Sequence, residues 1–371
     1  MSSTPEVYLD SASAQRLHPA ARETLLAALD RGYADPRRLH GAGRDARLLL
    51  DNARAVVAEC LGARPDEIGF TGSGTDAVHR GLLGLTAATG RDGIVHSAVE
   101  HSSVLHAVQW RGSPAHASVP VDAAGRIDPA AVIEAAKGPG VGAVAMQAAN
   151  QEVGTLQPVD ELDLPGGIPL FVDAAAAIGH VALPDRWDAL AGSAHKWGGP
   201  PGVGVLAVRR PTRWTTPFPG DDGLDQPGFP NVPAALAAAA ALQAVIGERD
   251  EVAARQFAQV ARIRSAAAEL PDTEVVGDPD ARLPHLVTFS CLYVGGDEIV
   301  TALAARGFGV ASGSACTAST LEPSHVLAAM GALTHGNVRV SLTPDTTDDE
   351  VEAFCAALAG SVHDIRERAG V

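Results

Sequence analysis

The chain has 371 residues, of which 46% are apolar and 19% charged, as is typical of a folded globular protein. Its formal net charge of −16 argues against binding to nucleic-acid phosphates, because proteins that do so are usually basic. The four cysteines form neither a disulfide framework nor a metal-ligand pair, and no signal peptide is recognisable. We therefore expect a cytoplasmic protein.

Periodic apolar residues predict alternating helices and strands in the first half of the chain. The helices are expected at residues 19–30, 45–61, 76–85 and 102–108. The strands are expected at residues 67–71, 93–96, 141–148, 168–173 and 202–208. This alternation is typical of an α/β protein with a largely parallel sheet, in which ligands bind at the carboxyl ends of the strands.

A loop rich in Gly, Pro and Asp is predicted over residues 217–233, followed by a long helix from 234 to about 270. Strands are then expected at 286–290 and 338–342. We place a domain boundary near residues 245–265, within the long helix.

Lysine is scarce, because Lys137 and Lys196 are the only two in the chain. Lys196 lies in Ser193-Ala-His195-Lys196-Trp-Gly-Gly-Pro, where small residues let a ligand approach the backbone. A lysine held there could form a Schiff base with an aldehyde cofactor. A solvated loop lysine is the open alternative.

Two further motifs follow predicted strands. Asp173 ends an apolar strand, where its carboxylate suits either a protonated ring nitrogen or an ordinary helix cap. The turn Gly72-Ser-Gly74-Thr75 precedes a helix, an arrangement that binds phosphate through backbone N–H groups. A simple glycine turn explains it equally.

Three residues stand out as reactive or charged. His101 follows a strand and could stack on a ring and exchange protons, or be a structural histidine. Cys316 lies among small polar residues, as suits a mobile nucleophile or a passive loop thiol. Arg339 alternates with apolar residues in a strand and needs a carboxylate partner, from a substrate or from the protein. All these motifs together indicate a pyridoxal-phosphate (PLP) enzyme that acts on an amino acid.

The sequence resembles the cysteine desulfurases, within the class V aminotransferase group of fold-type I PLP enzymes. The resemblance runs from Val7-Tyr-Leu-Asp-Ser-Ala-Ser13 to Arg339-Val-Ser-Leu342 and the helix after it. Its most specific part is Ser312-Gly-Ser-Ala-Cys316-Thr-Ala with Glu322-Pro-Ser-His-Val-Leu-Ala-Ala-Met-Gly331, which is similar to the long-loop, NifS-like subgroup that serves iron–sulfur clusters and tRNA thiolation.

The resemblance implies an α/β fold with a large PLP-binding domain, residues 12–250, whose mainly parallel sheet is flanked by helices. It implies a smaller α+β domain of residues 1–11 and 251–371 that carries Cys316 and Arg339. A homodimer with active sites at the subunit interface is expected, without membrane or direct nucleic-acid binding.

It also implies a role for each motif residue. Lys196 would form the Schiff base, Asp173 would pair with the pyridine nitrogen, and His101 would stack on the ring and act in catalysis. The cofactor phosphate would be bound by Gly74, Thr75, Ser193 and His195. Asn150 would lie near a cofactor oxygen and the substrate carboxylate, which Arg339 would hold. Cys316 would take the sulfur of L-cysteine as a persulfide, release alanine and pass the sulfur to an acceptor protein.

Three positions depart from the family pattern. Ala176 stands where the family usually has a Gln that bonds the cofactor's phenolic oxygen. Gln226 and Phe229 replace the Arg and Thr of a stretch whose Thr reaches the partner subunit's phosphate. Ala176 and Phe229 leave open a β-lyase or selenocysteine lyase acting on another sulfur or selenium amino acid. A non-catalytic scaffold of the same fold is a further alternative. The sulfur pathway is also open among iron–sulfur assembly, tRNA thiolation, DNA sulfur modification and natural products.

Overall fold

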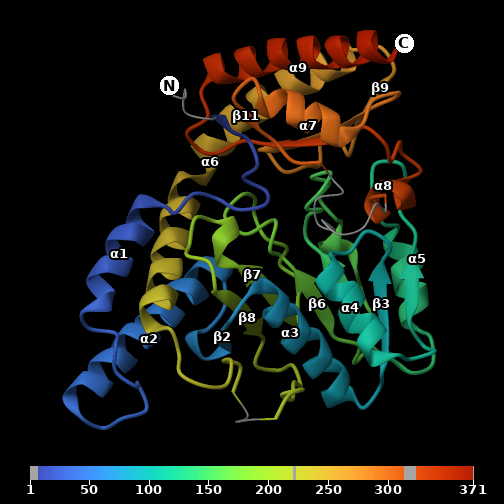
Figure 1. The fold of residues 1–371 in the computed structure, drawn as a ribbon. Helices are drawn as coiled ribbons and strands as arrows, with labels where there is room; N and C mark the ends of the chain where they lie inside the picture. Colours follow the sequence, from blue (N-terminus) through green and yellow to red (C-terminus); the bar gives the residue numbers. More distant parts are fainter. Residues whose placement is uncertain (1–6, 220–222, 313–322, 371) are drawn as a thin grey trace.

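The computed structural model describes residues 7–219, 223–312 and 323–370. A seven-stranded sheet of order β2-β8-β7-β6-β5-β3-β4 forms the centre of the larger part (Figure 1). Its strands are β2 (Ile68–Thr71), β3 (Gly93–Ser97), β4 (Ala117–Val119), β5 (Val141–Gln147), β6 (Leu170–Asp173), β7 (Ala189–Ser193) and β8 (Gly204–Val208). Neighbouring strands are parallel except that β8 runs antiparallel to both β2 and β7, so the expected mainly parallel sheet is confirmed.

Helices cover this sheet, and its central strands are buried along their whole length. These strands consist largely of Ala, Val and Leu, without alternation of apolar and polar residues. Such sequences are typical of a parallel sheet that is covered on both faces. The helices of this part are α1 (Pro19–Leu29), α2 (Gly41–Leu61), α3 (Gly74–Thr89), α4 (Ser102–Arg111) and α5 (Pro129–Ala136), with short 3₁₀ turns η1 (Pro65–Glu67), η2 (Val159–Glu161) and η3 (Ala194–Lys196).

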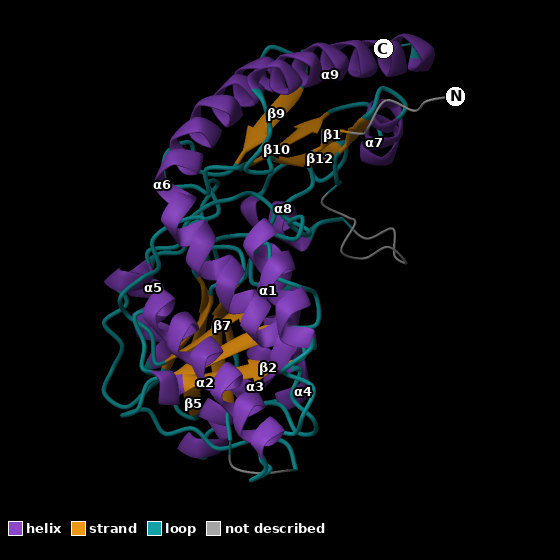
Figure 2. Cartoon of the chain, turned by 90° about the vertical axis from the view of Figure 1, so that its left-hand side faces the viewer, coloured by secondary structure: helices purple, strands orange, loops and turns teal. Residues whose placement is uncertain are grey.

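The smaller part contains a three-stranded antiparallel sheet of order β12-β10-β9. Its strands are β9 (Thr273–Val276), β10 (Leu286–Cys291) and β12 (Asn337–Ser341), and β1 (Val7–Tyr8) pairs in parallel with β11 (Phe308–Gly309). Its helices are α7 (Gly296–Ala304), α8 (His325–Met330) and α9 (Asp348–Ala369). The 37-residue helix α6 (Val232–Ala268) runs from the larger part to the smaller one (Figure 2).

Helix α6 contributes to two separate hydrophobic cores. Its first third, around Ala237 and Leu242, packs in the core beneath the large sheet. Its last third, around Val260 and Ile263, packs with Leu9 and the strands of the small sheet in a second core. The expected division at residue 250 falls between these two stretches and stays a prediction.

Some elements differ from those expected. Helix α2 begins at Gly41 rather than at residue 45, because the His40 ring accepts a hydrogen bond from the Gly43 N–H at 3.2 Å and caps it. Strand β7 was not predicted, since its Ala, Gly and Ser residues have little preference for strands. Helix α5 was not predicted either. Among the described residues, no helix is both long and apolar enough to cross a membrane.

Candidate active site

The glycine turn after β2 lies directly against the end of β7. Ser73 caps α3 by accepting a hydrogen bond from the Asp76 N–H at 3.0 Å, so Gly74 and Thr75 are the first residues of the helix. A Cβ on Gly74 would lie 2.7 Å from the Ser193 Cβ and 3.0 Å from its Oγ. Glycine is therefore required for this close approach, which brings an N-terminal helix end and the Ser193 hydroxyl to one place.

Ser193, His195 and Lys196 follow one another from the end of β7 into η3. The Ser193 Oγ lies 3.1 Å from the His195 Nδ1. Burial, and then the charge of Lys196, lower the pKa of His195, so that this ring is neutral at physiological pH. The arrangement provides neutral hydrogen-bonding groups beside the only lysine in the segment.

Asp173 occupies the carboxyl end of β6, the neighbour of β7. It is 6% exposed, and its Oδ1 accepts a hydrogen bond from the Ala175 N–H at 3.0 Å. Its charge raises the pKa of His101, whereas the charge of Lys196 lowers it. Both groups therefore act on the same imidazole, which connects three of the predicted site residues electrostatically.

His101 caps helix α4 with its Nδ1, which accepts a hydrogen bond from the Ser103 N–H at 3.2 Å. The ring proton of the neutral form is thus on Nε2. Burial is the largest influence on its pKa and lowers it. A neutral ring with a protonated Nε2 can stack on an aromatic ligand and exchange a proton at that atom.

Asn150 lies in the buried turn after β5. Its Nδ2 donates to the Val99 carbonyl at 3.1 Å and lies 3.4 Å from the Gln147 Oε1, while its Oδ1 accepts from the Glu152 and Val153 N–H groups. The amide is engaged by the protein on both sides. A contact with a ligand would require one of these bonds to be exchanged.

Arg339 is 5% exposed in β12, and its carboxylate partner is Asp10, at 2.9 Å from Nη2. Ser13 Oγ and the Gln151 carbonyl oxygen accept further hydrogen bonds at 2.7 and 3.0 Å. The Nε is buried and has no hydrogen-bond partner among the described residues. The protein thus fixes the guanidinium through its two terminal nitrogens, and the buried Nε is left without a partner among the described residues.

The family model Aminotransferase class-V matches residues 7–354. The chain belongs to this family. Over 98% of both chains it is 34% identical to the IscS-like cysteine desulfurase of Mycobacterium tuberculosis. It is 33% identical to the cysteine desulfurase NifS of Azotobacter vinelandii, over 94% of this chain and 90% of that protein. A solved NifS-like protein has a TM-score of 0.87 and 26% identity over 97% of this chain and all of the other.

These relatives confirm the resemblance to class V cysteine desulfurases and the fold-type I architecture that it implied. Most of the predicted site residues lie at the carboxyl ends of β5, β6 and β7 and at the start of α3 and α4, whereas Arg339 lies in β12. The functional assignments of the individual residues stay predictions.

Cys316 lies outside the described residues. The other three cysteines carry no disulfide, and burial raises the pKa of each thiol, that of Cys60 to about 11. A thiol with a raised pKa is a poor nucleophile at neutral pH. Cys60, Cys291 and Cys355 are therefore poor candidates for a sulfur-transfer residue.

The three departures from the class V pattern have different surroundings. Ala176 lines a small cavity together with Lys196. Gln226 lies against the glycine turn after β2, as a Cβ built on Gly72 would be 2.7 Å from the Gln226 Oε1. Phe229 is 58% exposed. The first two changes therefore alter the site of the single subunit, whereas Phe229 alters its surface.

Several polar residues of the site were not predicted from the sequence. Glu100 is fully buried, with Oε1 accepting from the Ser97 hydroxyl at 2.7 Å and from the Gln147 N–H at 3.0 Å. Burial raises its pKa to about 8. Its place beside His101 was the only signal in the sequence. The histidines His180 and His285, which stack behind Lys196, left no signal at all.

Proposed function

We propose that this protein is a PLP-dependent cysteine desulfurase, which converts L-cysteine to L-alanine and transfers the sulfur to an acceptor. The observation that carries the proposal is the cluster of Lys196, Asp173 and His101 in a chain that matches a cysteine desulfurase over 98% of its length. Arg339, which pairs with Asp10, is the candidate for binding the substrate carboxylate.

The described residues fit PLP. The start of α3 and Ser193 approach so closely that a Cβ on Gly74 would block the space between them, as suits a phosphate cradle. Ser193, His195, Gly74 and Thr75 would hold the phosphate, and Asp173 would pair with the ring nitrogen. Lys196 would join the aldehyde covalently. When bound, PLP supplies an electron sink for the substrate's Cα.

The protein's own groups would then orient the amino acid and move its protons. Arg339 would bind the substrate carboxylate through its unpaired Nε, held in place by Asp10 and Ser13. His101, neutral and protonated at Nε2, would stack on the ring and exchange a proton there.

Sulfur transfer would use Cys316. Its thiolate would attack the sulfur of the substrate, and an S–S bond would form as the Cβ–S bond breaks. The electron pair of that bond would go to Cβ, which takes up a proton to become the methyl group of alanine. The persulfide on Cys316 would then be passed on.

The deciding experiment measures alanine and sulfide from L-cysteine in Cys316→Ala. We expect a loss of at least a hundredfold with the cofactor still bound, because no other described thiol is poised as a thiolate. Cys355→Ala is the matched control and should keep full activity. Undiminished turnover in Cys316→Ala would refute the assignment of the nucleophile.

A second candidate is a β-lyase or selenocysteine lyase, favoured by the cavity beside Ala176 and Lys196. It differs in the substrate and not in the cofactor. A panel of cysteine, selenocysteine and cystathionine, with product analysis, separates the two. Preferred turnover of a substrate other than cysteine would replace the first proposal by this one.

A homodimer is part of the proposal. Large apolar side chains are exposed on α1, α2 and their connection, namely Leu26, Leu29, Tyr33, Leu39 and Leu48. Apolar residues gathered on one surface often mark a subunit interface. Sedimentation of the purified protein tests this assembly.

A protein sulfur acceptor and a cytoplasmic location complete the proposal. A thiol nucleophile that cycles through a persulfide needs a reducing compartment. Transfer of labelled sulfur from L-cysteine to candidate acceptors tests the first point, and cell fractionation tests the second.

A further inference from the structure

Two histidines stack directly behind Lys196. The rings of His180 and His285 have centroids 4.0 Å apart and an interplanar angle of 27°. The Nε2 of His180 lies 3.1 Å from the carbonyl oxygen of Lys196 and donates to it. His285 immediately precedes β10, so this contact joins the start of the small sheet to the lysine segment of the large one.

His180 and His285 are largely buried, and one ring nitrogen of His285 has no hydrogen-bond partner among the described residues. His285 is 2% exposed, and its Nδ1 makes no hydrogen bond within the described part of the chain. An unsatisfied buried donor or acceptor is costly, so its persistence calls for a ligand or another purpose. Burial lowers the pKa of both histidines, helped at His285 by the charges of Arg339 and Lys196. Both rings are therefore neutral, and one nitrogen of each is a donor.

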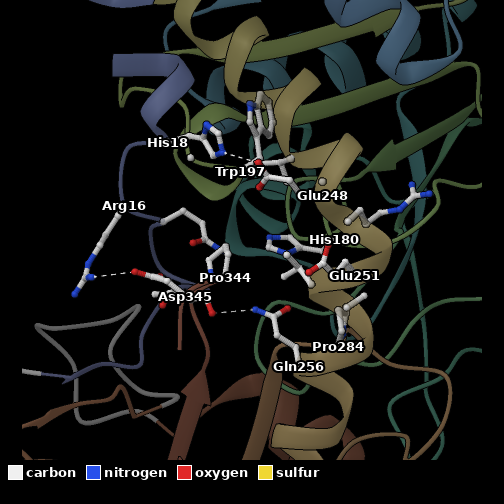
Figure 3. Close-up of a pocket in the computed structure, with 18 of the residues that line it drawn as sticks. Arg16, His18, His180, Trp197, Glu248, Glu251, Gln256, Pro284, Pro344 and Asp345 are labelled. Atoms are coloured by element: carbon white, nitrogen blue, oxygen red, sulfur yellow. Dashed lines mark hydrogen bonds and ion pairs between the residues drawn. The ribbon is translucent and has the colours of Figure 1, made fainter. Parts of the chain in front are cut away.

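The two histidines line the small cavity that also contains Lys196 and Ala176. On its other side His180 contributes to a groove of about 570 Å³ between α6, the segment before α1 and the 343–345 turn. Figure 3 shows His180 in this groove with Trp197 and Pro284. His180 thus borders both the open groove and the inner cavity at the lysine, whereas His285 borders only the cavity.

We propose that His285 is a cofactor-binding residue whose Nδ1 donates a hydrogen bond to the phenolic oxygen of PLP. This inference rests on the proposed function. In PLP the phenolic oxygen is carried by the ring carbon next to the one that bears the aldehyde, so it lies beside the lysine that binds the aldehyde. Ala176, which borders the same cavity, has no polar group to meet that oxygen. His180 is a positioning residue, which orients the ring of His285 by stacking.

The test compares His285→Phe, which keeps the stacking surface and loses the nitrogen, with His285→Asn, whose amide lies near the place of Nδ1. We measure the dissociation constant for PLP of each apoprotein and the visible absorption band of the loaded protein. His285→Phe should bind PLP about tenfold more weakly, as for the loss of one hydrogen bond, and should shift the band. His285→Asn should stay within about threefold of the parent.

Rescue makes the test specific. The double variant Ala176→Gln/His285→Phe should recover most of the affinity and the original band, because Gln at 176 supplies an amide from another lining position of the same cavity. His363→Phe on the surface of α9 is the control and should change neither value. Unchanged binding and spectrum in a folded His285→Phe, or failure of the Gln to restore them, would overturn the inference.

A measurement on the parent protein covers the case in which His285→Phe does not fold. With ¹⁵N-labelled histidine, addition of PLP to the apoprotein should shift the Nδ1 resonance of His285, assigned through His285→Asn. An unshifted resonance would overturn the inference. If the parent protein binds no PLP at all, the proposed function fails instead, so the two failures are distinguishable.

Discussion

At the scale of single residues, the two lysines differ in every respect that matters for chemistry. Lys137 caps the end of α5, is exposed, and pairs with Glu134 at 2.6 Å, as suits a cation at a helix C-terminus. Lys196 is in the 3₁₀ turn at the end of the central strands, and its charge acts on His101 and His195. The structure thereby distinguishes the surface lysine from the candidate catalytic one.

Replacing each lysine by arginine gives a matched pair of variants. Lys196→Arg should reduce turnover by at least a thousandfold and abolish covalent binding of PLP, because a guanidinium does not form a Schiff base. Lys137→Arg should retain both. Borohydride reduction followed by mass spectrometry locates the attached cofactor. Labelled cofactor on Lys137, or in Lys196→Arg, would contradict the assignment.

Glu100 should make stability depend on pH. Its folded-state pKa of about 8 lies above the ordinary value of 4.5, mainly because of burial. The stability from the protonated carboxyl is complete below about pH 4.5 and declines as pH rises to about 8. Relative to Glu100→Gln, the parent protein should therefore lose on the order of a few kcal/mol of unfolding free energy over this range.

Urea denaturation at pH 5, 6.5 and 8 measures this difference. The same substitution at the exposed Glu352 on α9 is the control for the loss of a carboxylate by itself. If the difference in unfolding free energy between Glu100→Gln and the parent protein stays constant from pH 5 to 8, Glu100 is ionised over this whole range.

At the scale of elements, the site is made by the ends of strands and the beginnings of helices. Asp173 and Ser193 end β6 and β7, whereas Gly74 and His101 begin or cap α3 and α4. Parallel strands bring all such ends to one edge of the sheet. The closest of these contacts is between Gly74 and Ser193, so it should be the most sensitive to added volume.

Gly74→Ala tests that contact. A methyl group 2.7 Å from the Ser193 Cβ must push the two elements apart, at a cost of about 1–3 kcal/mol in PLP binding or in unfolding free energy. Gly41→Ala in α2 is the control, since a Cβ there meets nothing within 4 Å. Titration of the apoproteins with PLP measures the binding affinity, and thermal unfolding measures the change in stability. Equal PLP affinity in Gly74→Ala and Gly41→Ala would show that close packing between Gly74 and Ser193 is not needed for PLP binding.

At the scale of the whole molecule, a dimer would cover the exposed leucines of α1. Leu26 and Leu29 are 53% and 54% exposed, so charges there should leave the monomer folded. Leu26→Glu/Leu29→Glu should shift the protein from dimer to monomer in analytical ultracentrifugation, whereas Trp110→Glu on the exposed side of α4 should not. A dimer that survives the double substitution must use another surface.

The two cores joined by α6 suggest two domains, 12–250 and 1–11 with 251–371. We expect native-state hydrogen exchange to separate the amides of β5 and β6 from those of β10 and β12, with different free energies of opening. Amides in the middle of α6 should follow the less stable set. One common opening for all four strands would argue for a single cooperative unit.

The sequence by itself determined the fold class, most strands of the large sheet and the positions of the motifs, whereas β7 was not predicted. It could do so because local patterns and short loops place Asp173, Lys196 and Gly74 at element ends, and the family match over residues 7–354 agrees. Only the tertiary structure decided that Asp10 is the partner of Arg339 and that His285 lies behind Lys196. These contacts join residues more than 80 positions apart through the packing of two cores, which no local pattern encodes.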